Sequence, residues 1–178
     1  MTEASPNQAS SSQPVNGPLF GKAAVLEGLP NHPAVKAILS WNAGALTDAK
    51  FDFDELTLTI VPEEIRAACL AVKAAGYNFF EDVTAVDWFP ASPRFQLSYH
   101  ILSHRFKARI RLRVLLQDAN PAVESIVPVW AGANYYEREV FDLFGIRFEE
   151  HPNLRRIMMP DEWNGHPLRK DYPVEGYR

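Results

Sequence analysis

The sequence predicts a two-layer α+β domain, with a mostly antiparallel sheet of about four strands packed by helices and a long irregular C-terminal tail. Strand patterns are grouped along the chain and helical patterns are set apart from them, which argues against a doubly wound parallel sheet. A chain of 178 residues is long enough to bury one such core without disulfides or metals. We therefore divide it into a segment over 1–18, a domain over 19–145 and a tail over 146–178.

The first 18 residues are rich in Ser, Pro, Gln and Asn and carry one charge. Such a composition cannot bury enough apolar surface to offset the entropy of ordering, so we expect disorder. The stretch lacks the basic start and apolar run of a signal peptide. No stretch of about 20 uncharged apolar residues follows that could form a membrane helix. We expect a cytoplasmic protein that reaches a membrane only through a partner.

The domain opens with a predicted helix over 33–46 and a predicted strand over 51–61. The helix has weakly helical apolar spacing, and Gly44 leaves its end undefined. The strand alternates between apolar and polar residues, as half-buried strands do. The apolar positions are Val35, Ile38, Leu39 and Leu46 in the helix and Leu56, Leu58 and Ile60 in the strand.

A second helix is predicted over 62–75. Pro62 suits its first turn, Glu63 and Glu64 complement the positive end of the helix dipole, and Gly76 follows as a stop.

Three further strands and one helix complete the prediction. The strands cover 79–88, 95–102 and 107–116, and the last two are expected to form a hairpin. The final helix runs over 133–144 and ends at Gly145. The tail that follows has no sustained periodicity and contains Pro152, Pro160, Pro167 and Pro173.

Four basic residues alternate along the last strand: Lys107, Arg109, Arg111 and Arg113. They suit either an anionic partner such as nucleic acid, or a solvated outer face balanced across strands by Glu55 or by Glu81 and Asp87. A net charge of −4 and the lack of aromatic residues on that face favour the solvated face, and no nucleic-acid partner is expected.

Glu137 falls inside the apolar arc of the final helix, whereas Arg138, Glu139 and Asp142 lie outside it. A buried carboxylate must be paired, neutralised or used, so Glu137 suits a catalytic acid, a metal ligand or a structural ion pair. We favour a structural ion pair with an arginine of the tail, and predict that Glu137 pairs with an arginine of this chain or of a partner. Glu139 and Asp142 are three residues apart and could share a metal, but no histidine joins them on this helix.

Cofactor motifs are missing from the sequence. His151 and His166 are isolated from each other and from the single cysteine, Cys69, so a zinc site is disfavoured and an iron–sulfur cluster is excluded. Neither GxGxxG nor GxxxxGK nor GxSxG is present. The tail instead mixes six basic and six acidic side chains, which suits directional pairing at a protein–protein interface.

Three long motifs occupy the helix and tail: EREVFDLFGI at 137–146, HPNLRR at 151–156 and HPLRKDYP at 166–173. Shorter matches lie upstream, at 84–87, 93–95, 99–100 and 125–130. Together they resemble the thirty-kilodalton subunit of respiratory complex I, which in bacteria is the C subunit of NADH-quinone oxidoreductase (NDH-1). One departure is Glu150, where the family usually has glycine. Glycine there would permit a backbone angle that glutamate tolerates poorly.

The resemblance implies an assembly role in the quinone-reducing module of the peripheral arm. The whole complex passes electrons from NADH through FMN and iron–sulfur clusters to quinone and translocates protons. This chain would hold no flavin, cluster, metal or catalytic residue. Its partners would be the D subunit, of the forty-nine-kilodalton type, and the B subunit, which carries the terminal iron–sulfur cluster. It would be peripheral, on the cytoplasmic side of the cell (inner) membrane.

The resemblance also identifies a set of motif residues that would form the interface. They are Glu137, Arg138, Glu139, Asp142, Gly145, His151, Pro152, Arg155, Arg156, His166, Pro167, Arg169, Lys170 and Asp171. Two alternatives stay open. One is the equivalent subunit of an energy-converting hydrogenase-type membrane oxidoreductase. The other is a stand-alone hydrolase that uses Glu137 with His151 or His166.

Overall fold

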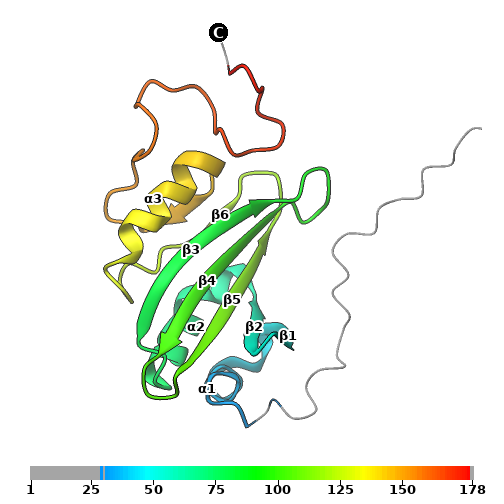
Figure 1. Ribbon diagram of the computed structural model, residues 1–178, viewed down its shortest axis with the longest axis vertical. Helices are drawn as coiled ribbons and strands as arrows, with labels where there is room; N and C mark the ends of the chain where they lie inside the picture. Colours follow the sequence, from blue (N-terminus) through cyan, green and yellow to red (C-terminus); the bar gives the residue numbers. More distant parts are fainter. Residues whose placement is uncertain (1–28, 30, 177–178) are drawn as a thin grey trace, which may run out of the picture.

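A five-stranded mixed sheet forms the centre of the structure, a computed structural model that describes residues 29 and 31–176 (Figure 1). The strand order is β1-β2-β5-β4-β3; β2 and β5 are parallel, and the other neighbouring pairs are antiparallel. The α+β prediction is confirmed, with one strand more than the four expected. The segment predicted to be disordered, 1–18, lies outside the described residues. The strands are β1 Leu46–Asp52, β2 Glu55–Ile60, β3 Phe79–Asp87, β4 Phe95–Ser103 and β5 Ala108–Leu116.

Helices cover one face of this sheet and leave the other face to charged residues. α2 (Ile65–Ala74) lies behind the strands in Figure 1, α1 (Pro33–Asn42) packs against α2, and α3 (Ala133–Phe144) lies beside β3. On β5, Ile110, Leu112 and Val114 are fully buried in the core, and the arginines between them point to the opposite face. The alternating pattern read from the sequence therefore sets the two layers.

The N-terminal part of the sheet differs from the prediction. α1 ends at Asn42, and the short 3-10 helix η1 (Ala43–Ala45) separates it from β1. The Asn42 side chain accepts a hydrogen bond from the Gly44 N–H at 3.0 Å and so closes the turn. The strand predicted over 51–61 is a hairpin, because Phe53 and Asp54 both take positive φ, 49° and 60°, and reverse the chain. The usual Asn-Gly or Asp-Gly signal is absent there, so the turn was missed.

The remaining long elements were predicted correctly. The helix expected over 62–75 is present as the 3-10 helix η2 (Pro62–Glu64) followed by α2. β4 and β5 pair as the expected antiparallel hairpin. α3 spans the predicted 133–144, and Gly145 ends it with a φ of 72°.

A second, two-stranded sheet joins the start of the tail to the domain. β6 (Ala122–Glu124) and β7 (Arg147–Glu149) pair in parallel, and Ile146 and Phe148 are buried in the core. Strands of three residues are too short for a periodic signal, so neither was predicted. From residue 150 to 176 the tail contains no helix or strand. Across residues 29 and 31–176, no helix has the length and apolar character needed to cross a membrane.

Candidate functional site

The tail closes over the C-terminal end of α3, as Figure 1 shows in orange and red. The last carbonyl groups of a helix have no partner within the helix and need donors from elsewhere. Three consecutive carbonyls of α3 receive donors from the tail, so this segment completes the helix. The donors and acceptors are His166 Nδ1 to Asp142 O at 2.8 Å, Leu168 N to Leu143 O at 3.0 Å and Arg169 Nε to Phe144 O at 2.6 Å.

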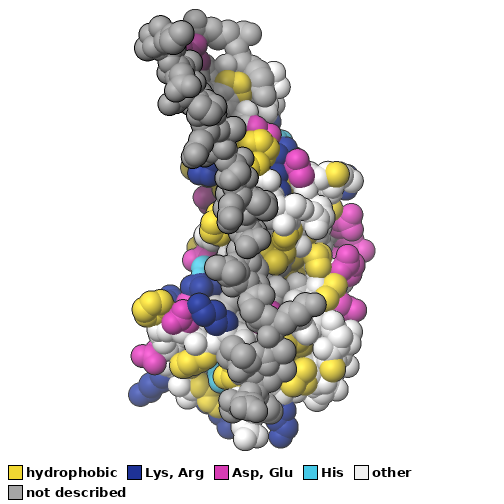
Figure 2. Space-filling model, turned by 90° about the vertical axis from the view of Figure 1, so that its right-hand side faces the viewer, with side chains coloured by type: hydrophobic (Ala, Val, Ile, Leu, Met, Phe, Trp, Pro, Cys, Tyr) yellow, Lys and Arg dark blue, Asp and Glu magenta, His cyan; other side chains and the backbone are white. Residues whose placement is uncertain are grey.

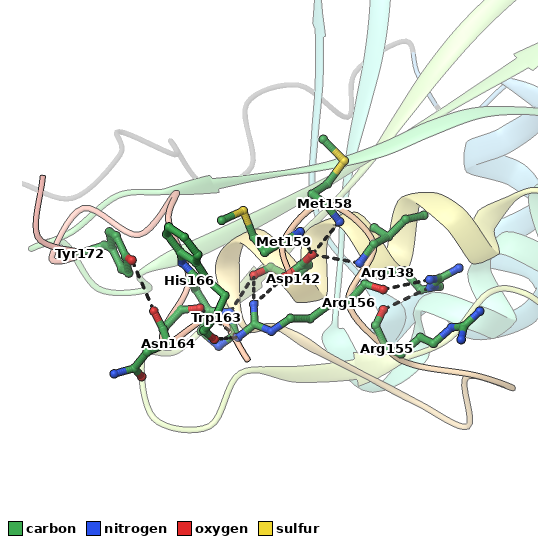
Figure 3. Close-up of polar contacts among 12 residues, drawn as sticks. Arg138, Asp142, Arg155, Arg156, Met158, Met159, Trp163, Asn164, His166 and Tyr172 are labelled. Atoms are coloured by element: carbon green, nitrogen blue, oxygen red, sulfur yellow. Dashed lines mark hydrogen bonds and ion pairs between the residues drawn. The ribbon is translucent and has the colours of Figure 1, made fainter. Parts of the chain in front are cut away.

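Asp142 holds the middle of the tail by its side chain (Figure 3). Its Oδ2 accepts three backbone N–H groups, from Ile157, Met158 and Met159, at 2.8–2.9 Å. Burial favours a higher pKa for this carboxyl, but these hydrogen bonds and Arg156 hold the pKa below its ordinary value. On the isolated helix Asp142 appeared to face outward, whereas the structure buries it under the tail. Both of its oxygens are occupied by these donors, whereas Glu139 is exposed.

Two arginines extend this anchorage along the tail. Arg156 Nη1 lies 2.5 Å from Asp142 Oδ1, and its Nη2 donates to the carbonyls of Trp163 and Gly165 at 2.9 and 3.1 Å. Arg138 of α3 donates to the carbonyls of residues 155 and 156 at 3.1 and 2.9 Å. Both of these motif arginines therefore bind the tail backbone of the chain itself.

A buried arginine that we did not single out, Arg94, ties the tail to the sheet. It contacts Asp87 through Nε at 3.0 Å and Nη2 at 2.8 Å, Asp171 of the tail at 2.7 Å and Asp118 at 2.8 Å. Hydrogen bonds to Asp87 and Asp171 raise the Arg94 pKa above its ordinary value. The Lys170 N–H also donates to Asp87 at 2.9 Å. Asp87 was expected to balance the basic strand, and that expectation was wrong because Arg94 binds it.

Gly145 is the point at which the tail crosses α3 most closely. A Cβ built there would lie 2.5 Å from Cδ2 of His166 and 2.8 Å from Nη2 of Arg169. The site therefore requires glycine both for its positive φ and for the space that the two motif side chains fill.

Glu137 is fully buried, but no arginine binds it among the described residues. Its carboxylate accepts from the Ser125 hydroxyl at 2.6 Å and the Ile126 N–H at 2.7 Å. The expected pairing with an arginine of this tail was therefore wrong; Arg66 acts on the carboxylate only at longer range. Burial raises the pKa of Glu137 to about 7, although these two hydrogen bonds and the Arg66 charge act to lower it.

His151 faces Glu137 inside the protein, with its Nε2 3.9 Å from Oε2. The same nitrogen donates to the Asn134 carbonyl at 3.2 Å, and Nδ1 accepts from the Asn153 N–H at 3.0 Å. Both the His151 and Glu137 side chains are fully buried, so no substrate reaches them from solvent in this structure. His166 instead donates to the Asp142 carbonyl at the end of α3.

Three of the four basic residues are neutralised within the sheet, whereas Lys107 is exposed in the turn before β5. Arg109 binds Glu55 at 2.7 Å and lies 3.7 Å from Glu81, and Arg111 also pairs with Glu55. Arg113 lies 3.2 Å from Asp48 of β1. The expected charge balance across strands is thereby confirmed for Glu55 and Glu81, but the face is only partly solvated, because Arg113 is buried. Figure 2 shows charged side chains of both signs mixed with apolar ones over the described part of the face it draws.

Glu150 has a φ of 59°, the left-handed conformation that a family glycine would adopt without strain. The expected backbone angle, one that glutamate tolerates poorly, is therefore confirmed at Glu150. Its carboxylate lies 2.5 Å from Nη1 of Arg66, whose Nε donates to the Ser125 carbonyl at 2.8 Å. Arg66 thus joins α2 to the turn after β7.

The outer side of the tail carries large apolar side chains. Met158 is 61% exposed, and Val174 is fully exposed. Pro152 and Arg155 are exposed and Pro167 is half-buried. A tail fixed by its backbone and polar groups thus leaves large apolar side chains exposed among charged ones, and we call this set of apolar residues the outer tail surface. Its members are Ile157, Met158, Trp163, Leu168 and Val174.

Among residues 29 and 31–176, no three His, Cys, Asp or Glu side chains meet in an arrangement that could hold a metal ion.

The chain resembles known proteins over most of its length. A family model described as "Respiratory-chain NADH dehydrogenase, 30 Kd subunit" matches residues 58–178. The C subunit of NADH-quinone oxidoreductase from Citrifermentans bemidjiense is 43% identical over 147 residues, covering 82% of this chain and 91% of the relative.

Two solved structures share the fold. A trypsin-resistant fragment of Nqo5 has a TM-score of 0.60 at 28% identity, covering 68% of this chain and 99% of the fragment. A chain of the membrane-bound sulfane sulfur reductase, an archaeal respiratory membrane complex, has a TM-score of 0.68 at 23% identity, covering 79% and 84%. With the family match over more than half of the chain, these findings give its relationship: it belongs to the family of the 30 Kd subunit of respiratory-chain NADH dehydrogenase.

Proposed function

We propose that this chain is a cofactor-free structural subunit of NADH-quinone oxidoreductase, in the quinone-reducing module of the peripheral arm. Electrons would pass from NADH through FMN and iron–sulfur clusters in partner subunits to quinone, without a redox group in this chain. The family membership and the relatives named as C subunits of that enzyme support this assignment. The isolated chain would carry out no catalytic chemistry of its own.

The observation that carries the proposal is the way the tail is held. Buried groups of α3 and the sheet, chiefly Asp142 and Arg94, bind the inner side of the tail. The apolar side chains of the outer tail surface are exposed and are therefore available to contact a partner protein. We infer that the tail over 146–178 is the docking segment of a domain over 19–145.

The partners that we propose are the D subunit, of the forty-nine-kilodalton type, and the B subunit, which carries the terminal iron–sulfur cluster. The complex would hold the chain on the cytoplasmic side of the cell membrane. In this arrangement the motif residues act mainly by shaping the tail, and the outer tail surface makes the contact.

The test uses tagged full-length chain expressed in its own cells in place of the wild type. We expect Met158→Glu and Val174→Glu to deplete the chain from complex solubilised from membranes, because a charge would be buried at the interface. Phe53→Glu is the matched control, since Phe53 is 95% exposed and lies in the β1–β2 turn. Wild-type yield of assembled complex for both tail variants would overturn the docking role.

The same purification tests a second candidate, the equivalent subunit of a hydrogenase-type membrane oxidoreductase. The likeness in fold to a chain of an archaeal respiratory membrane complex motivates it. Proteins that bear the NADH site and flavin among the co-purified subunits would support the first function. A nickel–iron large subunit in their place would support the second.

A further inference from the structure

A groove lies between the end strand β3 and helix α3, and the tail does not fill it. Its volume is about 350 Å³, at the lower end of the roughly 300–1,000 Å³ typical of binding pockets. It is lined chiefly by apolar side chains, and its volume suits a few apolar side chains of a partner and not a whole helix. Those residues are Val83, Ala85, Tyr136, Val140, Leu143, Phe144 and Leu168.

Charge at the groove is negative and partly uncompensated. Glu139 lines it, is exposed and has no ion pair within the described part of the chain. Asp82 lines it as well and is bound to His100 at 2.6 Å. The lining contains no lysine or arginine. A partner that fills the groove is therefore favoured if it brings a basic side chain to Glu139.

The groove is continuous with the outer tail surface. Leu168 belongs to both, and its N–H donates to the Leu143 carbonyl at 3.0 Å, which fixes the groove at that end. Along the opposite wall, β3 is the last strand of the sheet, so its outer backbone groups have no neighbouring strand. A segment that leaves the outer tail surface can thus enter the groove without a break in contact.

We propose that this groove is a docking site for a short segment of a partner subunit, one that carries one or more large apolar side chains and a lysine or arginine that pairs with Glu139. This inference rests on the proposed function, because it places a subunit of the same complex in the groove. The apolar side chains fill the space between β3 and α3, and the basic side chain neutralises Glu139.

The test places a photocrosslinker in the groove of the assembled complex. Thr84→p-benzoylphenylalanine and Tyr136→p-benzoylphenylalanine both alter exposed side chains that line the groove. Complex purified through a different subunit is irradiated, and the crosslinked peptides are identified by mass spectrometry. We expect adducts to one segment of another subunit that contains a large apolar residue and a lysine or arginine.

Charge reversal gives the second measurement. In the same complex Glu139→Lys should lower the adduct yield about tenfold, the effect of losing one interaction of about 1.4 kcal/mol. Glu149→Lys is the matched control, because Glu149 is exposed on β7 and does not line the groove. An equal loss of adduct in both variants would refute the pairing.

Several outcomes would overturn the proposal. They are adducts only to a second copy of this chain, to its own segment 1–28 or to lipid, and no adduct at all. If the chain is in the complex but gives no partner adduct, the docking site is refuted and the proposed function stands. If the chain is absent from the complex, both fail.

Discussion

Arg156 and Asp142 form the pair around which the tail is built, with Nη1 and Oδ1 2.5 Å apart. The carboxylate is fully buried, and the arginine side chain is partly buried. Because Asp142 also accepts three successive backbone N–H groups, one side chain of α3 sets the path of the chain at residues 156–159. The pair therefore links the helix motif to the tail motif, which lie apart in sequence.

Asp142→Asn should destabilise the protein by about 3 kcal/mol, the loss typical of breaking a buried charge pair. The new amide would direct an NH₂ group at backbone N–H groups or at Arg156, and the arginine would lose its counter-ion. Urea unfolding measures the change. The control is Asp161→Asn, an exposed position expected to change stability by less than about 0.5 kcal/mol. Equal stabilities of the two variants would show that Asp142 is not the anchor.

The extent of α3 could be predicted from sequence because it is long, periodic and ended by a glycine. β1 could not, because its start depends on the Asn42 turn and its end on two non-glycine residues with positive φ. These are local backbone conformations without a residue-type signal. β6 and β7 are held by pairing across the chain and carry no pattern of their own.

The site was predictable in residue type but not in pairing. Asp142 faces outward on an isolated helix, and only the folded tail covers it. Arg94 follows a proline turn and precedes a strand, so no periodicity marks it as the centre of three carboxylates. Glu150 was the exception: a comparison with the family glycine correctly indicated a strained backbone.

Glu137→Gln should change the pH dependence of stability. The folded pKa of Glu137 is about 7, above its ordinary value of 4.5, so the folded chain holds a proton that the unfolded chain releases. The protonated Glu137 carboxyl therefore contributes stability at low pH, and this contribution is lost as pH rises from about 4.5 to 7. Relative to Glu137→Gln, the wild type should lose about 3 kcal/mol between pH 4 and pH 8.

Unfolding in urea at a series of pH values measures this difference. Burial lowers the pKa of His151, which gives the opposite trend, but His151 is present in both proteins and largely cancels. The nearby groups Arg66, Cys69 and Tyr99 are likewise common to both. A difference that stays constant with pH would contradict the raised pKa.

Gly145→Ala should loosen the tail as well as destabilise the domain. The left-handed φ costs an L-residue about 1–2 kcal/mol, and the new methyl would displace His166 and Arg169 from the end of α3. We expect faster tryptic cleavage after Arg169 and Lys170 together with a lower Tm. Gly132→Ala is the matched control, because its φ is −63° and nothing lies within 4 Å of the added Cβ. Equal cleavage rates in the two variants would show that the crossing at Gly145 does not hold the tail.

Arg94→Met should destabilise the protein by about 3–5 kcal/mol, because it leaves Asp87 as a buried charge without a counter-ion. The pKa values of Asp87 and Asp171 are lowered in the folded state, Asp87 despite its burial, so their stabilisation is present above the ordinary carboxyl pKa and lost as pH falls. The gap between Arg94→Met and wild type, measured by urea unfolding, should therefore narrow below about pH 4. Arg105→Met, at an exposed arginine that lies over the ring of Phe106, should differ from wild type by less than about 0.5 kcal/mol. A gap for Arg94→Met that is small at neutral pH, or that widens in acid, would mean that Arg94 does not hold the tail to the sheet through these carboxylates.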